Sequence, residues 1–208
     1  MLRVIFGITV YIYCYTSYAQ TATEFIKLYN EHIDPKNTLD SLNSFHVKKE
    51  LRATGVLNST PVNLVKIDEC QYFANGGSKC INTKTGHSLD LNLFPPIRNR
   101  FSNALKTELN FIPITQDSTF FRIISVSDSI TVIEQVFSSF HKFIYTFDSK
   151  TKDLIQMENF FVKNESIYSS KTRYLVYQRI DSILVAISIT FQNDFLSATL
   201  EHSNCSFE

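Results

Sequence analysis

The sequence has 208 residues, of which 44% are hydrophobic and 19% are charged, a globular composition that excludes a wholly disordered chain. Lys and Arg together number 20, as do Asp and Glu, so the net charge is zero and nothing indicates the broad basic surface of a nucleic-acid-binding protein. The 18 Phe and 10 Tyr, set against only 5 Gly, favour a β-rich domain with a bulky interior.

The first 19 residues have the pattern of a signal peptide. Arg3 precedes an apolar run over Val4–Tyr13, and small residues stand at Ser17 and Ala19. The apolar part covers roughly 10–12 residues, short of the ~20 that span a bilayer, so a transmembrane anchor is the weaker alternative. Acylation at Cys14 is also disfavoured, because bulky residues precede it. We predict cleavage after Ala19 and export, to the bacterial periplasm.

A helix is predicted at the start of the mature chain. Apolar residues recur at helical spacing within Thr21–Ile33, namely at Phe25, Leu28, Tyr29 and Ile33. The pair Asp34-Pro35 ends the pattern.

From Phe45 the period of the apolar residues changes to two, which predicts a long half-buried strand. One face carries Phe45, Val47, Lys49, Leu51, Ala53, Gly55 and Leu57. The other face carries His46, Lys48, Glu50, Arg52 and Thr54. A second strand is expected over Val62–Phe73.

The next segment predicts a hairpin closed by a disulfide. Asn75, Gly76 and Gly77 are typical turn residues, and folding about them sets Cys70 opposite Cys80. An exported protein meets oxidising conditions, so we expect a Cys70–Cys80 bond, with Cys205 free or paired elsewhere. A metal site at these cysteines is the alternative, but no His stands at ligand spacing beside either.

The remaining chain is predicted as one helix followed by a run of strands. Three- and four-residue apolar spacing after two prolines indicates a helix over Ile97–Leu109. The expected strands are Phe120–Val126, Ile130–Phe137, His141–Phe147, Leu154–Phe161, Tyr168–Ile180, Leu184–Phe191 and Leu196–His202. Short turns join them, so neighbours should pair antiparallel. We expect an α+β fold: a large curled antiparallel sheet, an unclosed β-barrel, covered on its concave face by two or three helices in a single domain over residues 20–208.

No local catalytic motif or metal-ligand spacing occurs in the sequence, which indicates no enzyme, no cofactor and no metal. The apolar stripes of the late strands form either a packed core or the wall of a cavity for an apolar ligand. If they line a cavity, its residues are Leu51, Arg52, Phe143, Tyr145, Phe147, Met157, Phe161, Tyr174, Val176, Ile187, Ile189 and Phe191. Arg52 would meet a head group there, or form an exposed ion pair with Glu50.

Four segments resemble the periplasmic lipoprotein-carrier (LolA-like) family. They are the helix end Tyr29–Ile33, the strand Phe45–Gly55, the strand–turn–strand segment Tyr145–Leu154 and the late aromatic strand Arg173–Ile183. The resemblance implies an unclosed β-barrel with a helical lid and an apolar cavity for acyl chains. It implies a carrier or sensor of lipid or lipoprotein without covalent chemistry, with an envelope membrane protein as a further partner. Arg52 stands at a position similar to the strand arginine of that family.

Three hypotheses follow for the function. The first is a periplasmic carrier that binds an apolar ligand, and it requires a cavity. The second is an extracytoplasmic structural or protein-interaction module with a packed core. The third is a hydrolase whose residues come from distant parts of the chain, and it requires a His in contact with a carboxylate or hydroxyl.

Overall fold

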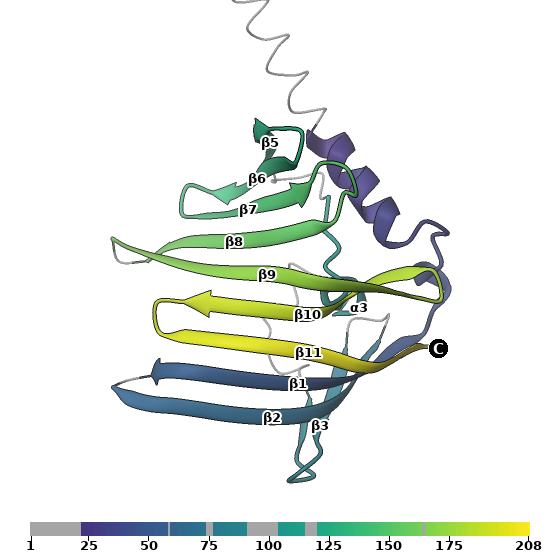
Figure 1. Ribbon diagram of the computed structural model, residues 1–208, viewed down its shortest axis with the longest axis vertical. Helices are drawn as coiled ribbons and strands as arrows, with labels where there is room; N and C mark the ends of the chain where they lie inside the picture. Colours follow the sequence, from purple (N-terminus) through teal and green to yellow (C-terminus); the bar gives the residue numbers. More distant parts are fainter. Residues whose placement is uncertain (1–21, 58, 74–76, 91–103, 115–119, 164) are drawn as a thin grey trace, which may run out of the picture. The chain divides into compact units, whose positions relative to one another are not determined.

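The computed structural model describes residues 22–57, 59–73, 77–90, 104–114, 120–163 and 165–208 (Figure 1). These residues divide into two compact units, one of residues 22–29 with 114–169 and the other of residues 30–113 with 170–208. The predicted signal peptide and residues 97–103 of the predicted second helix lie outside the described residues. Cleavage after Ala19 and a single domain over residues 20–208 stay predictions.

The first unit contains a four-stranded antiparallel sheet. Its strands are β5 (Phe120–Val126), β6 (Ile130–Ser138), β7 (His141–Asp148) and β8 (Leu154–Lys163). They lie in the order β8-β7-β6-β5, so each strand pairs with the next one along the chain and β5 is the edge. The short turns allow this order, because two strands joined by a tight turn pair antiparallel.

The interior of the first unit is closely packed around β7. Phe147 is fully buried, and its ring centroid lies 5.1 Å from that of Phe25 and 5.0 Å from that of Tyr29 on the N-terminal helix. Tyr145 is also buried and donates a 2.7 Å hydrogen bond to Oε1 of Gln135. The aromatic side chains of Tyr145 and Phe147 on β7 therefore pack against the helix and the neighbouring strand.

The N-terminal helix covers residues 22–33, and its buried stripe shares Tyr29 and Ile33 with the predicted one. Its buried residues are Ala22, Ile26, Tyr29 and Ile33. Leu28, which we expected to face inward, is 46% exposed. Helical spacing fits both sets of residues, so the spacing alone did not decide between Ile26 and Leu28 as the inward residue.

The second unit contains the other seven strands of the 11-stranded antiparallel sheet, in the order β4-β3-β2-β1-β11-β10-β9. Its strands are β1 (Ser44–Leu57), β2 (Thr60–Phe73), β3 (Ser78–Asn82), β4 (Ser88–Asp90), β9 (Ser166–Ile180, whose first residues belong to the other unit), β10 (Ile183–Asn193) and β11 (Leu196–Phe207). The order of strands ends at β4 on one side and at β5 on the other, and these two strands are not paired with one another, so the sheet is open. The predicted strands are present, although β11 extends five residues beyond its predicted end at His202, and the short strand β4 was not predicted.

The first and last strands of the described residues, β1 and β11, pair with one another in the middle of this sheet. In the pairing of β1 with β11, Phe45 lies opposite Phe207 at one end and Gly55 lies opposite Leu196 at the other. Glycine is required at position 55 because the β11 backbone approaches closely there: a Cβ atom would lie 2.1 Å from the carbonyl oxygen of Phe195. That same oxygen accepts a 2.9 Å hydrogen bond from the amide of Val56. This bond holds the end of the β1–β2 hairpin against the end of the β10–β11 hairpin.

The predicted disulfide is confirmed. Cys70 of β2 and Cys80 of β3 are direct cross-strand partners, and their sulfur atoms are bonded. Cys205, half-buried on β11, is the free cysteine of the described residues.

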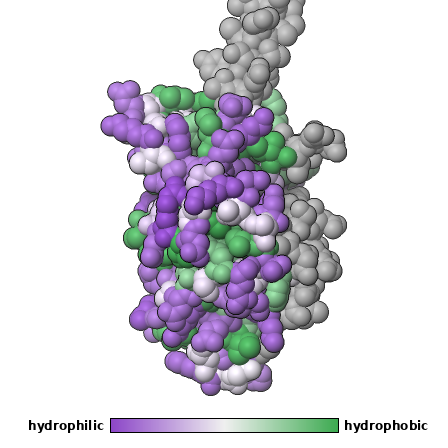
Figure 2. All heavy atoms as spheres, turned by 90° about the vertical axis from the view of Figure 1, so that its right-hand side faces the viewer, coloured by the Kyte–Doolittle hydropathy of each residue, from purple (hydrophilic) through white to green (hydrophobic). Residues whose placement is uncertain are grey.

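The expectation of two or three covering helices is not confirmed. Among the described residues only the helix at 22–33 exceeds two turns, while η1 (Leu39–Ser41) and α3 (Ala104–Glu108) are short. No described helix combines the length and the apolar character that a membrane span requires. One face of the molecule carries mostly hydrophilic residues with smaller hydrophobic groups between them (Figure 2), as is typical of a surface exposed to water.

Candidate ligand-binding cavity

The candidate site is a hollow on one face of the sheet in the second unit. A row of cross-strand partners crosses five strands there, from Leu64 through Ala53, Ala198 and Phe191 to Thr172. The two alanines stand next to each other on β1 and β11, in the middle of the row. Because their side chains are single methyl groups, the row is low at its centre and high at its sides.

A second row borders this hollow one pleat further along the strands. Leu51 faces Leu200, Leu200 faces Ile189, and Ile189 faces Tyr174. These side chains point the same way as the first row, since residues two apart on a strand share a face. The two rows together form an almost wholly apolar wall.

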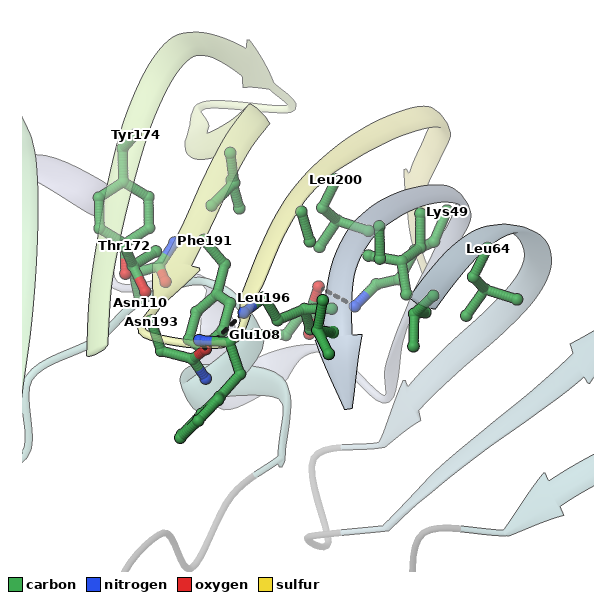
Figure 3. Close-up of a pocket in the computed structure, with 17 residues that line it drawn as sticks. Lys49, Leu64, Glu108, Asn110, Thr172, Tyr174, Phe191, Asn193, Leu196 and Leu200 are labelled. Atoms are coloured by element: carbon green, nitrogen blue, oxygen red, sulfur yellow. Dashed lines mark hydrogen bonds and ion pairs between the residues drawn. The ribbon is translucent and has the colours of Figure 1, made fainter. Parts of the chain in front are cut away.

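The cavity over these rows has a volume of about 620 Å³, within the range of roughly 300–1,000 Å³ that is usual for small-molecule sites (Figure 3). It lies entirely within the second unit. It is lined by Lys49, Leu51, Ala53, Val56, Val62, Leu64, Glu108, Asn110, Thr172, Tyr174, Ile189, Phe191, Asn193, Phe195, Leu196, Ala198 and Leu200.

The two ends of the cavity differ in exposure. At the hairpin end, Val56 is 49% exposed and Phe195 is 60% exposed, so this rim is apolar and open. At the other end, the side chains of Lys49 and Glu108 are each only 14% exposed. Tyr174, on β9 at the side of the cavity, is buried.

Lys49 and Glu108 form an ion pair at the closed end, drawn as a dashed line in Figure 3. Lys49 belongs to the inward face of β1, and α3 brings Glu108 over it. The Lys49 ammonium also lies 4.7 Å from the ring centroid of Tyr72 on β2. A cation over an aromatic face is stabilised by the ring quadrupole.

His202 completes a buried polar cluster behind this ion pair. It is the cross-strand partner of Lys49 on β11, and its Nε2 lies 3.4 Å from Oε1 of Glu108. Its Nδ1 donates a 2.8 Å hydrogen bond to the carbonyl oxygen of Ala186. Among the described residues, Nε2 has no hydrogen-bond partner, since its contact with Glu108 lacks hydrogen-bond geometry.

The electrostatics of the cluster follow from burial and from the Glu108 carboxylate. Burial lowers the pKa of His202, although Glu108 opposes the shift. Burial, reinforced by the charge of Glu108, raises the pKa of Tyr72, Tyr174 and Cys205. Near neutral pH, His202 and the two tyrosines are therefore uncharged.

A second His contact bears on the hydrolase hypothesis. Nε2 of His46 lies 3.2 Å from Oγ of Ser44 and 3.1 Å from Oε2 of Glu208. A Ser-His-acid triad needs the serine and the acid on opposite ring nitrogens, but here one nitrogen meets both. Gln71 also donates a hydrogen bond to the Ser44 oxygen. This cluster does not have the geometry of a catalytic triad.

Four of the residues predicted to line a cavity do so: Leu51, Tyr174, Ile189 and Phe191. Arg52 does not, because it lies next to Leu51 on β1 and therefore on the opposite face, where it pairs with Glu50.

Two more predicted residues, Val176 and Ile187, are not among the lining residues. The β9–β10 register shifts at this point, from Ser188 opposite Val176 to Ile189 opposite Tyr174. A β-bulge of this kind interrupts the period of two, and Val176 is 47% exposed as a result.

The remaining five predicted residues belong to the first unit and do not line this cavity. They are Phe143, Tyr145, Phe147, Met157 and Phe161. Tyr145 and Phe147 are packed as described above, Met157 faces Tyr145 across the sheet, and Phe161 contacts the ring of Tyr168 at 5.7 Å.

The sequence reasoning missed the small residues and the polar cluster. Ala53 lies on the predicted inward face of its strand, but the predicted cavity wall consists mostly of large aromatic and aliphatic residues. Lys49 stood on the same apolar face, and a charged residue at such a position signals a buried partner. That partner, Glu108, could not be assigned from spacing.

No protein-family model matches the sequence, and no curated protein matches it either. Solved structures do match the fold. A putative outer membrane lipoprotein-sorting protein domain from Vibrio parahaemolyticus has a TM-score of 0.60 at 10% identity, covering 91% of this chain and 93% of that one. A LolA superfamily protein from Nitrosomonas europaea has a TM-score of 0.56 at 12% identity, covering 89% and 92%.

The fold resembles that of the LolA superfamily. A DUF1329 family protein from Desulfovibrio piger is similar too, with a TM-score of 0.57 at 8% identity over 88% of this chain and 93% of that one. At these identities the likeness concerns the fold alone. The resemblance noted in the sequence is thereby confirmed, and the open antiparallel sheet is LolA-like.

Proposed function

We propose that this protein is an exported carrier or sensor that holds an acyl chain of a lipid or lipoprotein in the cavity of the second unit, without covalent chemistry. The observation that carries the proposal is the apolar hollow of about 620 Å³ over Ala53 and Ala198. Each methylene group that moves from water into such a site contributes about 0.8 kcal/mol. A LolA-like fold and an oxidised Cys70–Cys80 pair agree with this proposal.

The experiment is to purify the mature chain and examine it by native mass spectrometry. We expect an added mass that organic extraction removes and that is identified as lipid. The extracted protein should then bind a fluorescent fatty acid saturably, with displacement by unlabelled hexadecanoic acid. Protein that purifies without lipid and shows no saturable binding would refute the proposal.

Export is tested separately by the mass of the secreted protein. We expect a chain that begins at Gln20. A protein that retains residues 1–19 in the cytoplasm would remove the periplasmic part of the proposal and leave ligand binding untouched.

A second candidate function is a protein-interaction module, favoured by the edge of the first sheet. Strand β5 pairs only with β6 within this unit, and Ile124 and Val126 on it are exposed. Edge strands of this kind can accept a strand from another protein. The Val126→Lys variant should abolish such a partnership and leave fatty-acid binding unchanged.

A further inference from the structure

The charged residues that line the cavity are confined to its closed end. Of the lining residues only Lys49 and Glu108 carry a charge, and they pair with one another. Along β1, Lys49 stands seven residues from Val56 at the open rim, which is about 23 Å at roughly 3.3 Å per residue. The cavity therefore runs from an open apolar rim to a buried ion pair.

The charges next to this ion pair are also compensated. Asp68, the partner of Lys49 on β2, forms its own ion pair with Lys66. His202 is buried and faces Glu108, and its lowered pKa keeps it neutral near pH 7. A ligand group that reaches the closed end thus meets no surplus positive charge among these residues.

We propose that the Lys49–Glu108 pair makes the cavity selective for amphiphiles with one uncharged chain end. The two charges of the pair compensate each other at the closed end of the cavity, so an anionic chain end is rejected there. This inference rests on the proposed function. It assigns an orientation to the ligand: the methyl end of the chain lies against Lys49 and Glu108, and the charged head group lies at the rim formed by Val56 and Phe195.

The physical argument is one of desolvation. An anion at the closed end would lose its water without gaining a cation, since the Lys49 ammonium is already bound to Glu108. It would also lie close to the Glu108 carboxylate, where the low local dielectric strengthens repulsion. A methyl group loses nothing there, because it packs on the aliphatic stem of Lys49.

The experiment compares two probes of equal length, hexadecanoic acid and hexadecanedioic acid, in displacement of a fluorescent fatty acid from the wild-type chain. Both are measured at roughly pH 8, where carboxylates are ionised. We expect the dicarboxylate to bind weaker by about tenfold or more, because its second carboxylate must be buried. Equal binding of the two acids would overturn the inference and leave the carrier function standing. Failure of hexadecanoic acid to bind would instead refute the carrier function.

The variant Glu108→Gln provides a gain-of-binding test. It leaves the Lys49 cation without its partner, so the ratio of the two affinities should shift by about tenfold toward the dicarboxylate. The double variant Lys49→Met/Glu108→Gln should show no such gain, and neither should the matched control Glu50→Gln, which changes a carboxylate on the opposite face of β1. An unchanged ratio in folded Glu108→Gln would contradict the proposal. Circular dichroism shows whether Glu108→Gln is folded. If it is not, the comparison of the two acids on the wild-type chain decides whether the proposal holds.

Discussion

Ala53 of β1 and Ala198 of β11 face each other across the centre of the second sheet, although they come from opposite ends of the described chain. They are the two smallest side chains that line the cavity. The hollow is therefore produced by a cross-strand pair of methyl groups between the larger residues Leu64 and Phe191.

Filling this hollow should weaken ligand binding. In Ala198→Leu, three extra carbon atoms project into the cavity, so we expect about tenfold weaker binding of a fluorescent fatty acid at a stability cost of about 1–3 kcal/mol. Ser197→Leu is the matched control, because Ser197 is exposed on the other face of β11. Unchanged binding in Ala198→Leu would place the ligand elsewhere.

A truncation in the first unit should separate core packing from ligand binding. Phe147 is fully buried against Phe25 and Tyr29, so Phe147→Leu should lower the free energy of unfolding by about 1–2 kcal/mol. Fatty-acid affinity should not change, since Phe147 does not line the cavity. The two quantities are measured by urea denaturation and by probe titration. Weaker binding at full stability would show that the first unit takes part in the site.

His202 should make the folded state sensitive to acid. Burial holds its pKa below the ordinary value of 6.5, whereas the unfolded chain titrates near that value. Below about pH 6.5 the unfolded state binds more protons, so stability should fall as the pH drops toward the folded-state pKa, and stay constant above that window.

The variant His202→Asn tests the assignment of this acid sensitivity. Its amide can still donate a hydrogen bond to the Ala186 carbonyl, but it does not titrate, so the stability profile between pH 6.5 and the folded-state pKa should flatten. His87→Asn, at an exposed turn, serves as the control and should keep the wild-type profile. Chemical unfolding at a series of pH values measures both. A His202→Asn profile as steep as that of the wild type would contradict the assignment.

The Cys70–Cys80 bond should stabilise the protein through the entropy of the unfolded chain. The double variant Cys70→Ser/Cys80→Ser should lose about 2–4 kcal/mol of stability and have a lower Tm. Cys205→Ser removes a free thiol and should leave the Tm nearly unchanged. Thermal melts with and without a reductant provide the measurement: a wild-type Tm that reduction does not alter would show that the bond contributes little.

The strands could be predicted because their signals are local. A period of two, short turns and the symmetric position of Cys70 and Cys80 about Asn75 all act within one hairpin, and each is reproduced in the structure. The pairing of β1 with β11 could not be predicted in this way. It joins segments at great sequence distance, and no turn connects them.

The site was predicted only in part for the same reason. Leu51, Tyr174, Ile189 and Phe191 were identified by alternation, but alternation does not tell a filled interior from a hollow. That difference depends on the sizes of cross-strand partners such as Ala53 and Ala198. It depends also on bulges, and the one beside Ser188 turned Val176 away from the cavity.

The central pairing of β1 with β11 has a consequence for biogenesis. A chain that crosses a membrane from its amino end delivers β1 first and β11 last, so the floor of the binding chamber is incomplete until translocation has finished. In the meantime β1 pairs with β2 along one edge, but its other edge lacks β11, and an exposed edge of that kind invites aggregation. For an exported chain, as proposed above, the sheet would be completed only in the receiving compartment, after β11 has arrived.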